Sequence, residues 1–230
     1  MVSLKTVSLN CAELTTREIT TALAELPDGT QVTITEPRGR HSLAVGLRNR
    51  IRITVEGNAG YFLGGLCDGP DITVKGHVGW SVAENLMSGS VRVAGNASEC
   101  AGASGHGGTV IVEGDASSRA GISLKGGTLI VGGDVGHMSG FMAQAGVLLI
   151  GGDAGEALGD SLYEAVIYVA GNIRSLGADA QVEELAAADV ERVEELVKLA
   201  GFDHINPENV TRIGSARELY NFNSLKDHAY

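Results

Sequence analysis

The sequence predicts an all-β solenoid, a parallel β-helix of about seven coils, and three observations carry that prediction. Glycines recur at intervals of 19 residues from Gly57 to Gly171 without slippage. Two apolar residues separated by one position precede each glycine, which is typical of a short strand with one buried face. Aromatic residues make up only 4% of the 230 residues, which suits a narrow core of stacked aliphatic side chains. A fixed period near 20 with this alternation inside it indicates a strand-based solenoid.

The glycines of the repeat are predicted to be its structural corners. A small polar residue follows six of the seven, and His77 follows the remaining one. Glycine and asparagine tolerate positive φ, so this step suits a tight turn. A second glycine or alanine recurs seven places after each, from Gly64 to Ala178, and predicts another corner. The predicted corners are Gly57, Gly76, Gly95, Gly114, Gly133, Gly152 and Gly171.

Stacking explains how such a coil is held. Each short strand bonds to the coils above and below it at a spacing of about 4.8 Å. Connections between parallel strands favour the right hand. We therefore expect a right-handed parallel β-helix with an aliphatic core.

The segment 1–40 is predicted to close the first end of this solenoid. Residues 2–9 alternate like a strand, Thr15 to Glu18 form a capping box that opens a helix ending before Pro27, and Val32 to Ile34 predict a second strand. An open solenoid end exposes unpaired backbone and core. We therefore expect a β-α-β cap over residues 1–40 and the solenoid domain over residues 41–180.

Residues 181–230 leave the repeat. Apolar residues recur at three- and four-residue spacing from Val182 to Leu199, which predicts an amphipathic helix whose other face is acidic and solvated. The stretch after Gly201 shows little helical or strand period and is predicted to be an extended tail. Aromatic residues are favoured anchors at interfaces. The interface candidates in this tail are Tyr220, Phe222 and Tyr230.

The charge balance bears on partners and location. The chain carries 17 basic and 28 acidic residues, a net charge of −11, which argues against nucleic acid as its main partner. No leader sequence and no apolar run long enough to span a membrane is evident, so we expect a cytoplasmic protein. One basic cluster suggests an acidic partner at least as well as phosphate: Arg38, Arg40, Arg48, Arg50 and Arg52.

A search for chemistry finds no catalytic, cofactor-binding or metal-binding residues. The three cysteines form no C-x-x-C pair, so neither zinc nor an iron–sulfur cluster is suggested. The glycine-rich segments lack the P-loop and Rossmann spacings, and the 19-residue period excludes the calcium-binding nonapeptide repeat. The histidines share no repeat position and are interpreted as solvated or hydrogen-bonded: His41, His77, His106 and His137.

One set of carboxylates does align from coil to coil. Asp115, Asp134 and Asp153 occupy the position after the corner glycine, where a ladder could in principle serve catalysis. Asparagine fills the same position in other coils, so turn chemistry is the favoured interpretation.

The coil resembles a known family. The pattern G-[DN]-[AV]-G, present at Gly133 to Gly136 and at Gly152 to Gly155, resembles the GXGXG domain. That family includes the C-terminal β-helix domain of glutamate synthase large subunits and the β-helix subunit of formylmethanofuran dehydrogenase. The resemblance covers about residues 40–180. As a free-standing chain with a helix and the tail Glu218 to Phe222, the sequence is most similar to the β-helix subunit of N-methylglutamate synthases, whose glutamate synthase domains are split over three polypeptides.

This resemblance implies a scaffold. The partners would be an amidotransferase-like subunit and an FMN-binding, glutamate-synthase-like subunit, with FMN and an iron–sulfur cluster on a partner and no catalytic residue here. The hetero-oligomer would convert methylamine and glutamate to N-methylglutamate and ammonia. The alternatives are the scaffold of a glutamate synthase proper, the scaffold of a formylmethanofuran dehydrogenase, and a self-sufficient β-helix enzyme such as a polysaccharide lyase.

Overall fold

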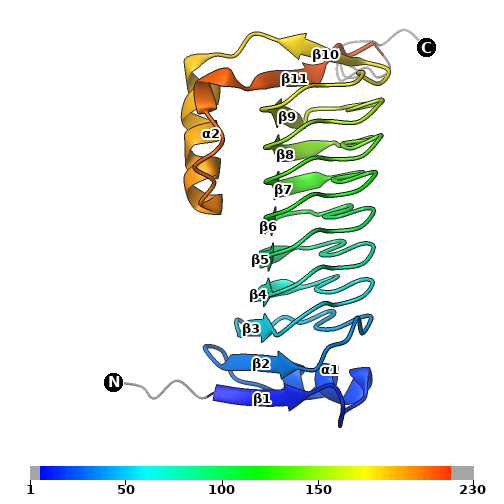
Figure 1. Cartoon of the computed structure of the whole chain (residues 1–230), viewed down its shortest axis with the longest axis vertical. Coiled ribbons are helices and arrows are strands. Elements are labelled where there is room, and N and C mark those ends of the chain that lie inside the picture. The colour runs from blue at the N-terminus through cyan, green and yellow to red at the C-terminus, as the bar shows by residue number, and fades with distance from the viewer. Residues whose placement is uncertain (1–5, 219–230) are drawn as a thin grey trace, which may run out of the picture.

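A single ladder of short strands runs the length of the molecule (Figure 1). The computed structural model describes residues 6–218, and the eleven strands of these residues form one sheet in the order β1-β2-β3-β4-β5-β6-β7-β8-β9-β11-β10. The predicted all-β solenoid, a parallel β-helix, is confirmed. The strands are β1 Thr6–Asn10, β2 Gln31–Thr35, β3 Arg52–Val55, β4 Asp68–Val74, β5 Ser88–Val93, β6 Thr109–Val112, β7 Lys125–Val131, β8 Ala145–Ile150, β9 Val166–Val169, β10 Ala180–Glu183 and β11 Thr211–Ser215.

The register of the coils follows the 19-residue repeat. Ile53 of β3 pairs with Ile72 of β4, and Ile72 pairs with Val91 of β5. The same column continues to Ile167 of β9, and every residue in it is buried. A second line of parallel bridges joins the residues two places after the corner glycines, from Ala59 to Ile173. Like residues therefore stack on like residues, and the core is an aliphatic column.

The second predicted corner is where the backbone takes positive φ. In the middle coil, Cys100, Gly102 and Ser104 have φ of 62°, 67° and 54°. The Gly102 N–H donates to Val82 of the preceding coil, whereas the N–H groups of Cys100 and Ser104 donate to carbonyls of the following coil. The backbone N–H groups of this corner thus find acceptors in both neighbouring coils. These hydrogen bonds offset the strain of a left-handed backbone at residues other than glycine.

The N-terminal end is built from β1, helix α1 (Thr16–Ala24) and β2. The predicted capping box is present: the Glu18 N–H donates to Thr15 Oγ1, and the Thr15 N–H donates to a Glu18 carboxylate oxygen at 2.8 Å. Ile19 and Leu23 of this helix are fully buried in the main core. Arg40 donates to the carbonyls that follow β1, which ties this end to the first coil.

The C-terminal end differs from the sequence-based expectation. The helix predicted to begin at Val182 begins at Ala187 (α2, Ala187–Ala200), because residues 180–183 form strand β10 instead. β10 pairs antiparallel with β11, and β11 pairs antiparallel with β9. The predicted end of the helix is nearly correct: Gly201 stops it with φ of +74°. A short 3-10 helix, η1 (Pro207–Asn209), leads into β11.

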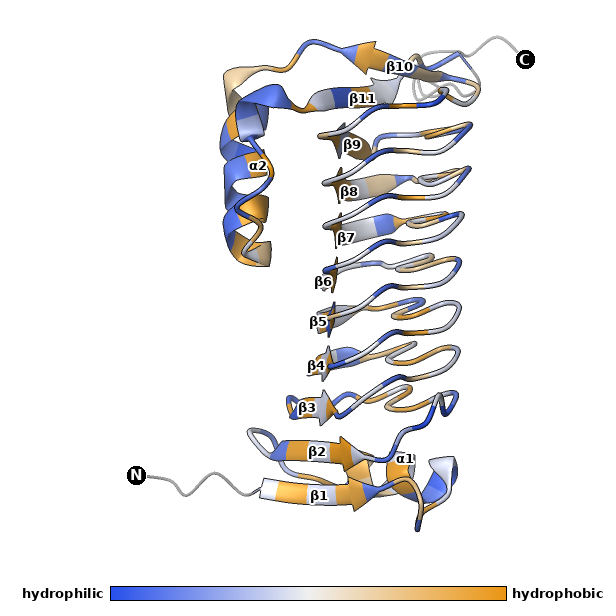
Figure 2. Cartoon of the chain, in the orientation of Figure 1, coloured by the Kyte–Doolittle hydropathy of each residue, from blue (hydrophilic) through white to orange (hydrophobic). Residues whose placement is uncertain are grey.

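Helix α2 stands against the outside of the rod, beside β6 to β9 (Figures 1 and 2). One outward-facing register column is apolar in these strands, with Ile111, Ile130, Leu149 and Tyr168, whereas the same column holds threonines in β2 to β4. Helix and strands enclose a second buried cluster, and burial of apolar area fixes the helix there. Its buried members are Ile111, Ile130, Val147, Leu149, Tyr168, Val193, Leu196, Ala200, Phe202, Ile205 and Val210.

Candidate functional site

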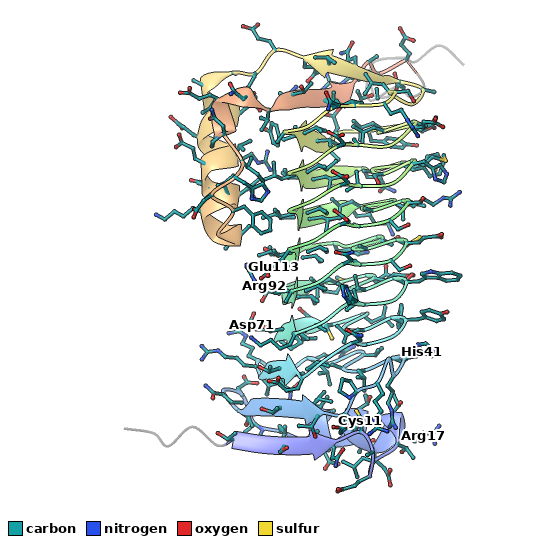
Figure 3. All side chains as sticks on the ribbon, viewed as in Figure 1. Cys11, Arg17, His41, Asp71, Arg92 and Glu113 are labelled. Carbon is teal, nitrogen blue, oxygen red and sulfur yellow. The ribbon has the colours of Figure 1, made fainter. Side chains whose placement is uncertain are left out.

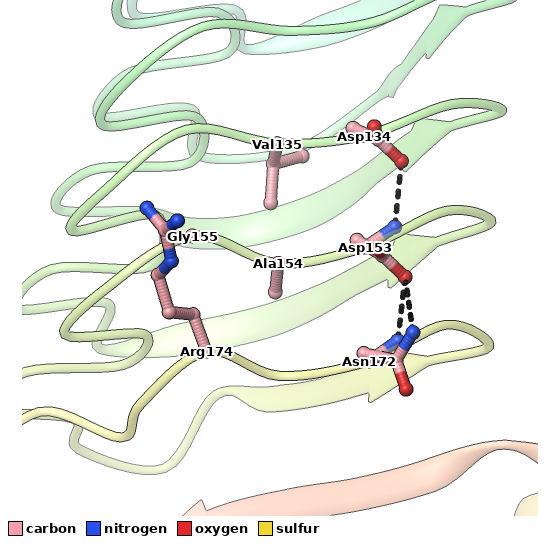
Figure 4. A pocket seen from close by; sticks show the side chains of 7 residues that line it. All are labelled: Asp134, Val135, Asp153, Ala154, Gly155, Asn172 and Arg174. Atoms are coloured by element: carbon pink, nitrogen blue, oxygen red, sulfur yellow. Dashed lines mark hydrogen bonds between the residues drawn. The ribbon is translucent and has the colours of Figure 1, made fainter.

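The residues after the corner glycines form a ladder of side-chain hydrogen bonds along the rod (Figure 4). The Asp134 N–H donates to Asp115 Oδ1 at 2.9 Å, the Asp153 N–H to Asp134 Oδ1 at 2.7 Å, and the Asn172 N–H to Asp153 Oδ1 at 2.7 Å. Asn58, His77 and Asn96 accept in the same way from the coil that follows each of them. Each side chain therefore fastens its own coil to the next one.

This ladder explains six of the seven glycines, and Gly57 is the exception. All seven lie in the bend after a strand, but of them only Gly57 has positive φ, so the predicted conformational reason is wrong for the other six. A Cβ at Gly133 would lie well within 3.0 Å of Asp115 Oδ1, and Gly76, Gly95 and Gly114 are crowded alike by the preceding coil. Close approach of the preceding side chain, rather than backbone strain, excludes a side chain at these positions.

A shallow depression of about 400 Å³ lies over the C-terminal part of this ladder, and Figure 4 shows its lining. The two carboxylates in it, Asp134 and Asp153, each commit one oxygen to the next coil. Arg174 lies 3.7 Å from Glu156 in an exposed ion pair. Residues 6–218 hold no group of three or more His, Cys, Asp or Glu side chains placed to bind a metal ion. The carboxylates thus brace the following coil, whereas the turn interpretation places their role within their own turn.

The histidines are part of the coil-to-coil contacts. His77 Nδ1 accepts the Asn96 N–H within the ladder. His41 Nδ1 accepts the Tyr61 N–H, and its ring stacks on Tyr61 with centroids 4.2 Å apart. Tyr61 and His137 both lie four places after a corner glycine, and His41 stacks directly on Tyr61. His41 and His137 therefore lie in the same column of the solenoid, contrary to the prediction. Other residues separate them, so no histidine stack results.

The aromatic contact continues for one more coil. Tyr61 and Trp80 stack with centroids 5.1 Å apart, and the two side chains remain 47% and 50% exposed. Such stacked pairs add about 0.5–1.5 kcal/mol each beyond buried area. His41 marks this edge of the rod, on the side away from α2 (Figure 3). The arrangement braces the first coils and also presents aromatic edges to solvent.

The cysteines are unsuited to nucleophilic chemistry at neutral pH. Cys11 and Cys67 are buried free thiols, and burial raises the pKa of Cys67 to about 11. Burial also raises the pKa of the partly exposed Cys100. A thiol becomes a good nucleophile only as the thiolate, and Cys11 and Cys67 belong to the buried core.

A polar network holds the C-terminal elements onto the last coil, and sequence reasoning missed it. The buried Tyr168 hydroxyl donates to Asp189 Oδ1 at 2.6 Å, and Arg212 Nε donates to the same oxygen at 3.0 Å. Asp189 also accepts the Ala186 N–H at the start of α2. Burial, followed by the hydrogen bond to Asp189, raises the pKa of Tyr168 to about 12. Arg212 pairs with Glu183 as well, which joins β11 to β10.

A second arginine secures the other end of α2. Arg92 donates to the Ala200 carbonyl at 2.7 Å and to Glu113 at 2.7 Å. Arg92 and Glu113 lie next to each other below the helix in Figure 3. A cation at a helix C-terminus compensates the unpaired carbonyls there.

The predicted basic cluster divides into two groups. Arg38 pairs with Glu36, and Arg40 bonds to backbone carbonyls. Arg48, Arg50 and Arg52 are exposed, and no ion pair joins them to another described residue. The interface candidates Tyr220, Phe222 and Tyr230 lie outside the described residues. Neither helix of residues 6–218 is long and apolar enough to cross a membrane.

Comparison with known proteins gives one partial similarity. Over 58 residues the chain is 44% identical to Protein GlxC of Rhizobium meliloti (strain 1021). The matched segment covers 25% of this chain and 25% of that protein. No family model matches the chain.

Proposed function

We propose that this chain is a non-catalytic scaffold subunit of a glutamate-synthase-like complex, and specifically of an N-methylglutamate synthase. The resemblance of its 19-residue coil to the GXGXG domain supports the general assignment. The partial similarity to Protein GlxC is compatible with it. The finer assignment rests on the resemblance of this chain, a solenoid followed by a helix, to the β-helix subunit of N-methylglutamate synthases.

The observation that carries the proposal is how the polar side chains of the solenoid are used. Ladder residues from Asn58 to Asn172 take part in bonds between adjacent coils. His41 and His137 bond to neighbouring coils as well. A general acid or base must reach a proton on its substrate, whereas these groups serve the stack of coils. A rod whose polar groups are used in this way suits a scaffold that holds other subunits better than it suits a catalytic site.

The partners in this proposal are an amidotransferase-like subunit and an FMN-binding, glutamate-synthase-like subunit. FMN and an iron–sulfur cluster would belong to a partner chain. On this chain, the C-terminal elements offer a docking surface because α2 is anchored at both ends, by Asp189 near its start and by Arg92 at its last carbonyls. A rigid attachment lets contacts on the exposed helix face position a partner relative to the rod.

Co-expression with the neighbouring genes tests the proposal. The chain alone should bind no flavin and turn over no substrate, whereas the assembled complex should contain flavin and consume methylamine together with glutamate. Truncation after Glu218 keeps β11 complete and removes the aromatic tail, so it should weaken assembly while the solenoid stays folded. Circular dichroism and co-purification measure these two effects separately.

Histidine variants provide the matched control. His106→Ala and His137→Ala in the assembled complex should retain activity within a few-fold. A loss above about a hundredfold with assembly preserved, the size expected for removal of a general acid or base, would contradict the scaffold role. A complex that uses ammonia but not methylamine would move the assignment to glutamate synthase proper.

A further inference from the structure

Within residues 6–218, strand β1 leaves an open sheet edge at the N-terminal end of the rod. It is the outermost strand in the order of the sheet, and among the described residues it pairs only with β2 (Figure 1). Helix α1 covers the end of the core with Ile19 and Leu23, but β2 remains the only described strand bonded to β1. An unpaired strand edge is a ready template for another strand.

The backbone groups on this edge can be assigned. The Cys11 N–H, directly after β1, donates to the Thr35 carbonyl of β2. Backbone direction alternates along a strand in a parallel pair, so Val7 and Leu9 also point their N–H and C=O groups toward β2. Thr6, Ser8 and Asn10 therefore point theirs away from it. Ser8 lies at the centre of the free edge and its side chain is exposed.

This edge lacks the features that usually prevent pairing. Residues 6–10 read Thr-Val-Ser-Leu-Asn, with no charge and no proline, and the register with β2 is regular. Natural sheets protect their edges with charged residues, prolines or bulges. At the opposite end of the sheet, the edge strand β10 carries Glu183, which pairs with Arg212.

The strand is also complementary to itself. In an antiparallel pair of two copies centred on Ser8, each Ser8 would exchange two backbone hydrogen bonds with its counterpart. Val7 would lie opposite Leu9 of the other copy, and Thr6 opposite Asn10. Val7 packs partly exposed against the core and Leu9 is buried, so the apolar row of one copy continues into that of the other.

The charge distribution favours a second copy at this end. Residues 1–95 contain nine basic and nine acidic side chains, whereas residues 96–230 contain eight basic and nineteen acidic ones, which accounts for the whole net charge of −11. Like charges facing one another across an interface cost free energy. Two copies joined at their N-terminal ends keep their acidic halves at opposite ends of the assembly.

From the open edge, the self-complementary strand and the neutral N-terminal half, we propose that two copies of this chain pair antiparallel along β1. The two sheets then continue through a twofold axis at Ser8. This pairing goes beyond the scaffold role, and it uses the end of the rod opposite to α2.

The mass of the full chain in solution, measured by sedimentation equilibrium at micromolar concentration, tests the pairing. Wild type should be a dimer, with twice the chain mass of 23.7 kDa. Ser8→Pro removes an outward N–H and leaves the bonds to β2 intact, so it should give the 23.7 kDa species with unchanged circular dichroism. Ser8→Lys, which places like charges across the twofold axis, should do the same and serves if the proline variant fails to fold.

Two controls make the result specific. Ser8→Ala should stay dimeric, and so should Val182→Lys, which adds the same charge to the edge strand at the other end. A monomeric wild type overturns the proposal, as does a dimer that survives both Ser8→Pro and Ser8→Lys or is lost in Val182→Lys. A monomeric wild type whose assembly with partner subunits is lost in Ser8→Pro also overturns self-pairing, and assigns the edge to a partner's strand instead.

Discussion

Adding one methyl group to a corner glycine tests whether the side-chain ladder sets the composition of the repeat. In Gly133→Ala the new Cβ would meet Asp115 Oδ1 well within 3.0 Å, while the next nearest atoms, Asp115 Cγ and Gly114 C, are 3.2 Å away. Inserting a group into occupied space costs about 1–3 kcal/mol. We expect Gly133→Ala to lose that much free energy of unfolding, although φ at this residue is not positive.

The partner substitution makes the test sharp. Asp115→Ala removes the acceptor of the Asp134 N–H and should cost about 1 kcal/mol, since the site is exposed. It also removes the atoms that obstruct a Cβ at Gly133 and leaves Gly114 C at 3.2 Å as the nearest of the three neighbours. The double variant should therefore lose little more free energy of unfolding than Asp115→Ala alone. The two substitutions would then show a favourable coupling of about 1–2 kcal/mol.

Gly152 supplies the matched control one coil further on. A Cβ there would meet Asp134 Oδ1, but also the backbone atoms Gly133 C at 2.7 Å and Asp134 N at 2.9 Å. Asp134→Ala removes only the side-chain obstruction and leaves the two backbone atoms in place. Combining it with Gly152→Ala should therefore recover little free energy of unfolding. Urea unfolding followed by circular dichroism gives the four free energies of each cycle. Strict additivity at Gly133, or equal rescue at both sites, would refute the crowding argument.

Two further predictions concern the coil and the pH dependence. Deleting Asn58 to Gly76 removes one 19-residue coil away from α2 and should leave a folded, β-rich protein, whereas deleting only Asn58 to Leu66 puts every later corner out of register and should abolish folding; equal circular dichroism for the two would exclude the repeat as the unit. The Tyr168 pKa of about 12 lies above the unfolded value near 10, so its contribution is present below about pH 10 and is lost as pH rises toward 12, up to about 2–3 kcal/mol. Tyr168→Phe should flatten the fall in unfolding free energy over this range. The raised pKa of Cys67 affects wild type and variant alike. Identical slopes of unfolding free energy against pH in the two proteins would therefore contradict the role of Tyr168.

The solenoid could be predicted because its evidence is repeated within the chain. Each coil presents the same alternation, and paired residues of neighbouring coils, such as Ile53 and Ile72, recur at the period of the sequence. The reason for the glycines could not be predicted, since it depends on where the side chain of the preceding coil points. Positive φ and steric crowding both favour glycine, and the sequence does not separate them.

The C-terminal elements were harder to predict for two reasons. Val182 fits helical spacing with Leu185 and Ala186, yet it lies in a strand because it pairs with Ile213 of β11, a residue distant in sequence. Residues 211–215 occur once, so no repetition marks them as a strand. A signal for the second core was present, however. Ile111, Ile130, Leu149 and Tyr168 make the outward positions apolar in four successive coils, which indicates that something covers them.

The position of β11 bears on how the chain is completed during synthesis. Each parallel strand from β3 to β9 can join the strand made just before it, so the rod can grow coil by coil as it leaves the ribosome. The free edge of β9 cannot be paired at once, because its next neighbour in the sheet is β11. β9 ends at Val169, whereas β11 begins only at Thr211. Until that segment emerges, a nascent chain presents the bare edge of β9 and the uncovered surface of Ile130 and Leu149. At ribosomal rates of about 5–20 residues per second, this interval lasts several seconds. During it the exposed strand edge and apolar surface would be accessible to a chaperone.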